Sequence, residues 1–504
     1  MSVDQRGRLI IVDDNARSGV RDRDDDGFEE TITIGSADGG LIVAGDPGAF
    51  YESVRARVGH WDLFPTGKEL VRGMDQGTNS ALPSEPRQEA EPAAILTSYD
   101  AEETVEVRVG AVQATIALDG DSDPEQATGV TLSIGKTADS FRPVDITLNI
   151  SDTRLNQLNM GVVGDLGTGK TQLLKSLILQ ISDSARENRG IQPRFLIFDY
   201  KRDYSSPDFV EATGARVVKP YRLPLNLFDT SAMGEAAAPW LDRFRFFADV
   251  LDKIYSGIGP VQRDKLKRAV RTAYEGCLPG QQPTLYDVHA AYGELLDGKS
   301  DSPMAIIDDL VDMEVFASQT RDTVPFDEFL DGVVVVSLDA LGQDDRSKNM
   351  LVAVMLNMFY ENMLRTPKRP FLGSDPQLRA IDSYLLVDEA DNIMRYEFDV
   401  LRKLLLQGRE FGTGVILASQ YLRHFKVNAT DYREPLLSWF IHKVPNVTPA
   451  ELSALGLTGS AAELAERVKS LQVHQCLYKS FDVPGEVVRG LPFFELLARE
   501  GSTG

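Results

Sequence analysis

The segment 164–171 has the residue types and the spacing of a loop that binds nucleotide phosphates. It reads GDLGTGKT, which fits the pattern GxxxxGK[ST]. Its glycines allow backbone N–H groups to turn toward a phosphate, and a helix that begins at Lys170 would direct its positive end at the same anion. Lys170 would reach the β- and γ-phosphate oxygens, and the Thr171 hydroxyl would bind Mg²⁺. We therefore expect ATP and Mg²⁺ as cofactors, with nucleotide contacts from Gly164, Asp165, Leu166, Gly167, Thr168, Gly169, Lys170, Thr171 and Gln172.

A second GKT triplet, Gly135-Lys136-Thr137, lacks this spacing. Five residues instead of four separate it from the upstream Gly129. The residues before it alternate apolar with polar side chains, which is typical of a half-buried strand. We therefore expect this triplet to end a strand and to bind no phosphate.

Two adjacent carboxylates, Asp388 and Glu389, follow an apolar run that begins at Tyr384. In a phosphoryl-transfer site, Asp388 would hold Mg²⁺ through water, and Glu389 would orient and polarise the attacking water. The alternative is a strand that ends in a solvated acidic turn. The phosphate loop upstream favours the catalytic interpretation.

The apolar run 413–419 has a candidate residue at each end. Gln420 follows it, at the end where ligands bind in open α/β sheets, and would bond the γ-phosphate or the water. Arg409 precedes it, and would neutralise charge on the phosphoryl group of a neighbouring subunit. The alternatives are a strand-capping amide for Gln420 and a surface arginine paired with a carboxylate for Arg409.

Strands and helices that alternate along the chain must position these residues. Runs rich in Val, Ile and Leu predict buried strands, and 171–182 has helical periodicity. This order is typical of an α/β fold with a mostly parallel sheet that helices cover on both faces. The predicted strands span 159–164, 194–200, 332–338, 383–389 and 413–420.

Composition divides the chain into four parts. Residues 1–72 form a mixed segment with short apolar runs, and 73–93 are rich in Gly, Pro, Ser and Glu, as in a flexible linker. Apolar and polar residues alternate over 94–152, which is typical of strands and predicts a small β-rich domain. The nucleotide-binding domain would cover 153–504, with a helical insertion at about 234–330.

The net charge excludes a generally basic nucleic-acid coat. The chain of 504 residues has 53 Lys and Arg against 76 Asp and Glu, which gives −23. Any nucleic-acid contact must then be local. Two distant cysteines, Cys277 and Cys476, make a disulfide framework unexpected. Without an apolar run of about 18 residues or a signal peptide, we expect no membrane contact and a cytoplasmic location.

Together these motifs resemble the HerA/FtsK superfamily of ring-shaped, ATP-driven DNA pumps, over roughly residues 145–490. The carrying segments are GVVGDLGTGKT, FDYKRDY (198–204), LPLNLFD (223–229), LLVDEAD and GREFGTGVILASQ. Two positions depart from the family's pattern, since Arg202 replaces a Gly and Leu227 a Pro. The resemblance implies that 153–504 is a RecA-like P-loop ATPase domain, and that Arg409 and Gln420 are its arginine finger and its sensor.

Within the superfamily, two stretches are similar to DptH-type ATPases of phosphorothioation-dependent restriction or modification systems. They are the segment around the phosphate loop and the tail from Leu455 to Leu497. The resemblance implies DNA, other proteins of the defence system and a homo-oligomer such as a hexameric ring as partners. Two alternatives stay open, an ATP-dependent assembly switch that does not translocate DNA and a conjugation or segregation motor.

Basic side chains in two places are candidates for DNA contacts. One group lies on a helix expected at 261–275, and the other follows the run 413–419. The alternative for the helix group is an ordinary solvated face. The candidates are Arg263, Lys265, Lys267, Arg268 and Arg271 on that helix, with Arg423 and Lys426 after the run 413–419.

Overall fold

The computed structural model describes two compact units, Met1–Thr115 and Ile116–Gly504. In the first it describes four short strands, and in the second residues 128–500 apart from short gaps. These gaps are 139–140, 232, 234–237, 256–257, 279, 343, 369–370 and 372–376. The predicted linker at 73–93 and the strands predicted between 94 and 127 lie outside the described residues.

The described strands of the first unit form one antiparallel sheet in the order β1-β2-β3-β4. Three of them fall within apolar runs that the sequence predicts as strands or buried runs. Their bounds are Ser2–Val3, Leu9–Ile10, Ile32–Gly35 and Gly40–Val43.

The second unit is built on an 11-stranded sheet in the order β6-β5-β17-β16-β15-β7-β12-β11-β8-β10-β9. The strands from β15 to β9 run parallel. Most of them are buried along their whole length, which explains their near-continuous Val, Ile and Leu content. The parallel strands are β7 (Met160–Val163), β8 (Arg194–Asp199), β9 (Arg216–Val218), β10 (Val333–Ser337), β11 (Ser383–Val387), β12 (Thr413–Ser419) and β15 (Ser438–Ile441).

Antiparallel strands extend this sheet at one edge. They are β16 (Gln475–Lys479), β17 (Glu486–Gly490), β5 (Thr131–Thr137) and β6 (Asp145–Asn149). The sequence assigns β5 and β6 to a separate small domain, but β5 pairs with β17, so the sheet has no break at residue 152. Alternation predicts that a strand exists and says nothing of its partner, which here comes from the far end of the chain.

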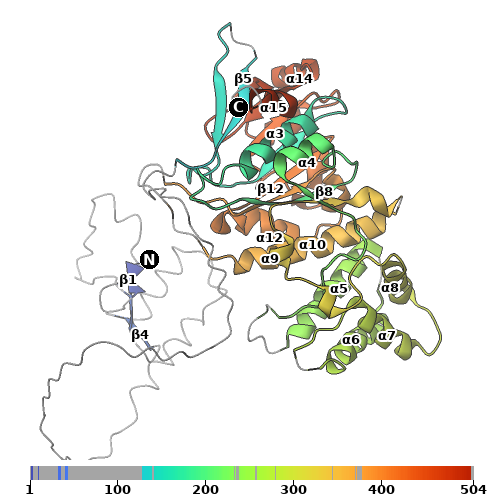
Figure 1. Cartoon of the computed structure of the whole chain (residues 1–504). Coiled ribbons are helices and arrows are strands. Elements are labelled where there is room, and N and C mark those ends of the chain that lie inside the picture. Colours follow the sequence, from blue (N-terminus) through green and yellow to red (C-terminus); the bar gives the residue numbers. More distant parts are fainter. Residues whose placement is uncertain are drawn as a thin grey trace, which may run out of the picture. The chain divides into compact units, whose positions relative to one another are not determined.

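Helices cover both faces of the sheet (Figure 1). One apolar cluster holds α3 (Lys170–Ser182), α4 (Pro207–Thr213) and the start of α15 (Phe493–Glu500) against one face. A larger cluster holds α10 (Asp345–Arg365) and α12 (Asp399–Gln407) against the other. The predicted RecA-like arrangement of a mostly parallel sheet between helical layers is confirmed.

The helical insertion lies between β9 and β10 in sequence, and Figure 1 shows its four long helices gathered together. Their apolar faces join the core on the α10 side of the sheet, and α5 packs against α10. The helices are α5 (Pro239–Tyr255), α6 (Pro260–Glu275), α7 (Leu285–Leu296) and α8 (Ser302–Asp312), followed by η3 (Thr320–Asp322) and α9 (Phe326–Phe329).

Short elements connect the larger ones. None of the helices in the described part of the chain combines the length and the apolar content that crossing a bilayer requires. The short elements are η4 (Leu338–Leu341), α11 (Asp391–Met394), η5 (Gly408–Phe411), η6 (Leu422–Phe425), β13 (Lys426–Val427), β14 (Thr430–Asp431), α13 (Pro449–Ser453) and α14 (Ala461–Ser470).

Candidate nucleotide site

The phosphate loop connects the end of β7 to the start of α3. Gly169 is the N-cap of α3 in a left-handed conformation (φ 101°), which glycine adopts without strain. A side chain at Gly164 would come within 2.6 Å of His442 Cβ and 2.8 Å of Thr168 Oγ1. The glycines at these two positions are therefore required by backbone conformation and by close packing.

Lys170, the first residue of α3, lies over the loop. Its ammonium donates to the backbone oxygen of Gly164 and, at 3.2 Å, to that of Asp165. Burial lowers the Lys170 pKa, while the nearby charges of Asp388 and Glu389 act in the opposite direction. Lys170 and the two acids thus lie within electrostatic range of each other, as the motifs predict.

Asp388 is a buried carboxylate at the end of β11 that accepts hydrogen bonds from two directions. The Tyr204 hydroxyl donates to its Oδ2 at 3.0 Å, and the Glu389 backbone N–H donates to its Oδ1 at 3.0 Å. Burial and the neighbouring Glu389 charge raise the Asp388 pKa to about 6. A buried carboxylate of this kind gains stability from a cation, which suits a Mg²⁺ ligand.

Thr171 and Asp388 are the protein groups that fit Mg²⁺. Thr171 is in the first turn of α3, and Asp388 is close enough to Lys170 to affect its pKa. A hydroxyl and a carboxylate are oxygen donors, and Mg²⁺ commonly takes one or two such protein ligands and completes its shell with phosphate oxygens and water.

Glu389 has a left-handed backbone (φ 55°) and both of its carboxylate oxygens are in contact with other side chains. Oε1 forms an ion pair with Lys201 Nζ, and Oε2 accepts a hydrogen bond of 3.4 Å from Gln420 Nε2. The structure therefore places Gln420, at the end of β12, beside the predicted base.

The loop after β8 is fixed by Asp199. Its carboxylate accepts backbone N–H bonds from Lys201, Asp203 and Tyr204, at 3.0–3.1 Å. Arg202, which replaces the family's glycine, takes a left-handed conformation (φ 64°) and forms an ion pair with Asp339. Arg202 thus keeps the backbone conformation that glycine favours. The loop places Lys201 and Tyr204 beside the acidic pair.

Two histidines support the phosphate loop from behind. His442 directly follows β15 and is fully buried. Burial, with a smaller effect from the nearby Lys170 charge, lowers its pKa to about 3, so the imidazole is neutral. The His474 backbone N–H donates to Thr168 O at 3.0 Å. Gln172, predicted among the nucleotide contacts, accepts a hydrogen bond from the Phe494 N–H at 3.4 Å, so its side chain is directed at α15.

Arg409 lies in η5, before β12. It is therefore at the amino ends of the parallel strands, whereas the phosphate loop is at their carboxyl ends. Within the described part of the chain, no hydrogen bond or ion pair holds its guanidinium. Arg379 is near it, and burial together with the Arg409 charge lowers the Arg379 pKa to about 10. The structure brings Lys170, Asp388, Glu389 and Gln420 together and leaves Arg409 apart.

Three of the five basic candidates on α6 contact other side chains of the chain. Arg268 pairs with Asp264 at 3.2 Å, Arg271 pairs with Glu275 at 2.7 Å, and Arg263 lies 5.8 Å from the centre of the Phe244 ring. This arrangement is typical of a solvated helix face. Arg423 and Lys426 are exposed and follow β12 and Gln420 in the chain. No ion pair of the described residues holds either of them, although Arg423 lies 4.2 Å from the centre of the Tyr421 ring.

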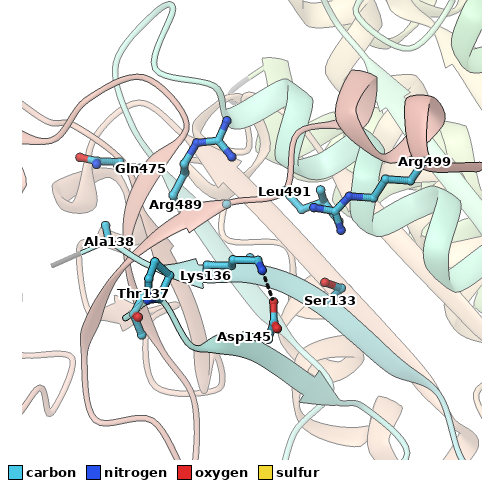
Figure 2. Close-up of a pocket in the computed structure, with 12 residues that line it drawn as sticks. Ser133, Lys136, Thr137, Ala138, Asp145, Gln475, Arg489, Leu491 and Arg499 are labelled. Carbon is cyan, nitrogen blue, oxygen red and sulfur yellow. Dashed lines mark ion pairs between the residues drawn. The ribbon is translucent and has the colours of Figure 1, made fainter. Parts of the chain in front are cut away.

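The second GKT triplet ends β5, as the sequence predicts. Lys136 pairs with Asp145 of β6 at 3.3 Å, which Figure 2 shows across the hairpin. The triplet lines a hollow of about 250 Å³ together with residues of β17 and α15. A strand offers no row of N–H groups that converge on one anion, so this triplet is no phosphate loop.

Sequence reasoning did not identify the contacts of Lys201 and Tyr204 with the acidic pair, or the two histidines. One signal was present for the first two. The segment FDYKRDY follows a buried strand, and the carboxyl ends of parallel strands meet at one edge of a sheet. His442 and His474 follow and precede strands that periodicity did not predict.

Comparisons with known proteins find the fold in solved structures. VirB4 of Thermoanaerobacter pseudethanolicus is similar over 72% of this chain and 98% of that chain, with 14% identity and a TM-score of 0.55. An unbound form of the bacterial conjugative coupling protein TrwBdeltaN70 is similar over 71% and 88%, with 15% identity and a TM-score of 0.45. No protein-family model and no curated protein matches the chain. Its fold is the RecA-like P-loop fold that the VirB4 structure shares.

Proposed function

We propose that the chain is an ATP-hydrolysing motor of the HerA/FtsK type. The observation that carries the proposal is the convergence of Lys170, Asp388 and Glu389 at the edge where the parallel strands end. Lys170 would hold the terminal phosphates, Thr171 and Asp388 would hold Mg²⁺, and Glu389 with Gln420 would orient the attacking water. Bound Mg²⁺ would neutralise charge on the phosphate oxygens. Solved TrwB structures contain ADP with Mg²⁺ and an ATP analogue.

The working form in this proposal is a homo-oligomer, such as a hexameric ring. Arg409 lies at the amino ends of the parallel strands, too far from the nucleotide site of its own subunit to contact it. In a head-to-tail ring, it could instead contact the nucleotide of the neighbouring subunit. An arginine finger of this kind contributes about 10³–10⁵ in rate.

DNA is the proposed substrate of the motor. Support comes from the resemblance to DNA pumps and from the exposed cations Arg423 and Lys426, which follow the sensor Gln420 in sequence. A contact there would lie next to the hydrolysis site in the chain. Arg268 and Arg271 of α6 are each paired with a carboxylate of the same helix, which makes that helix the weaker candidate.

The cellular role that we propose is phosphorothioation-linked DNA restriction or modification. It rests on the resemblance of the segment around the phosphate loop and of the tail from Leu455 to Leu497 to DptH-type ATPases. Other proteins of such a system would then be partners. A conjugation or secretion motor is the second candidate, and the fold shared with VirB4 supports it.

The experiment measures ATP turnover against oligomeric state, with and without DNA. A motor predicts turnover that rises on assembly and again with DNA, and that Lys170→Ala and Glu389→Gln abolish. Glu389→Gln should still bind ATP, whereas Lys170→Ala should lose phosphate binding. Assembly driven by ATP with no response to DNA would instead indicate a switch, and an assembled chain without turnover would contradict the proposal.

A further inference from the structure

The two contacts of Glu389 differ in strength. Lys201 is a full cation on Oε1, whereas Gln420 is a neutral donor at 3.4 Å on Oε2. The pair with Lys201 is only partly shielded from water, since the Lys201 side chain is 43% exposed and that of Glu389 is 15% exposed. Lys201 is thus the dominant partner of Glu389.

A base in this position must accept a proton from water. The ion pair directs Oε1 at the Lys201 ammonium and away from a water molecule that Glu389 would have to contact. The observed contact is therefore suited to a resting state rather than to the moment of hydrolysis.

Lys201 has room to leave this contact. Its backbone is fixed by a 3.1 Å hydrogen bond from its N–H to Asp199 Oδ1, so only the side chain need move. The side chain also lines a hollow of about 300 Å³, together with Tyr200, Arg202, Asp339, Gly342 and Lys348. A long, partly exposed lysine beside such a hollow can take two positions, one on Glu389 and one in the hollow.

We propose that Lys201 is a positioning residue that restrains Glu389, and that its side chain must swing into the adjacent hollow before Glu389 can act on water. The proposal rests on the proposed ATPase function and adds a control point to that site. It predicts that the restraint limits turnover in the chain without DNA, whatever the affinity for ATP.

The test compares Lys201→Met, which removes the cation, with Lys201→Arg, which keeps it. Lys201→Met should raise kcat without DNA by about fivefold, the most that a partly exposed ion pair is expected to bias a two-position equilibrium. KM and the Kd for ATP should not change in Lys201→Met. The kcat of Lys201→Arg should stay close to that of the protein without a substitution. Lys469→Met, which removes a surface lysine paired with Glu466, is the matched control.

Two further results decide the proposal. Lys201→Met combined with Glu389→Gln should be as inactive as Glu389→Gln alone, because the restraint acts only through Glu389. Turnover of the unchanged chain together with a lower or unchanged kcat in Lys201→Met would overturn the restraint alone. An absence of turnover in both would overturn the proposed function as well.

Discussion

Arg409 and Gln420 lie at opposite ends of the same strand, β12. Arg409 is at the amino ends of the parallel strands and Gln420 is at their carboxyl ends. The strand has seven residues, so about 20 Å separates the two ends. Gln420 is beside Glu389, and Arg409 is beside Arg379. One strand thus connects the nucleotide site of a subunit to the arginine that we expect to serve its neighbour.

Mixing two inactive variants tests the role of Arg409 across subunits. Arg409→Ala and Lys170→Ala should each lose about 10³-fold or more in ATP turnover when assembled alone. A 1:1 mixture should regain about a quarter of the unchanged rate, because random assembly places an intact Arg409 beside an intact Lys170 at that fraction of interfaces. Turnover is measured after co-assembly. Arg402→Ala, an exposed arginine of α12, is the control. No recovery in the mixture would place Arg409 outside the site.

Replacing Asp388 by Asn should stabilise the nucleotide-free chain at neutral pH. The raised pKa of about 6 means that the folded state holds the proton more tightly than the unfolded state does, so stability falls as the pH rises from about 4 through 6. Removing the charge should raise the free energy of unfolding by roughly 1–3 kcal/mol at pH 7 and by little at pH 4. Denaturant titrations at both pH values measure this, and an Mg²⁺-dependent ATPase assay should show loss of activity. An equal gain at both pH values would contradict the assigned cause.

Tyr204 should control the acid side of the pH profile through Asp388. Its hydroxyl donates to Asp388 Oδ2, which favours the charged carboxylate. Tyr204→Phe should therefore raise the pH at which turnover falls off in acid and should weaken Mg²⁺ binding. Removing this buried hydrogen bond should also cost about 1–3 kcal/mol of stability.

Tyr384→Phe is the control for this change. Tyr384 is also fully buried, but its hydroxyl makes only a 3.4 Å bond to the Leu158 backbone oxygen. It should leave the acid limb in place. If both tyrosine variants move that limb equally, the effect comes from packing and not from the bond to Asp388.

The positions of the two local motifs were predictable because each motif depends on residues that are close in sequence. The phosphate loop and the Asp388–Glu389 pair each occupy one strand end, so local spacing alone brings the residues of each motif together. The partners of Glu389 come from the ends of other strands, and only strand order shows that β8, β11 and β12 are adjacent. The place of β5 in the main sheet depends in the same way on β17, which lies about 350 residues later in the chain.

The salt dependence of DNA binding should distinguish the two groups of basic residues. Arg423 lies over the Tyr421 ring, 4.2 Å from its centre, and Lys426 begins β13 in an exposed position. Replacing both by Gln should weaken binding and reduce the slope of log Kd against log salt by about 2, because each cation would neutralise one phosphate. Replacing Arg268 and Arg271 of α6 by Gln should leave the slope nearly unchanged, because their charges are already paired with Asp264 and Glu275. Equilibrium titrations of a duplex at several salt concentrations measure both slopes, and a larger change from the α6 pair would move the DNA-binding surface to the helical insertion.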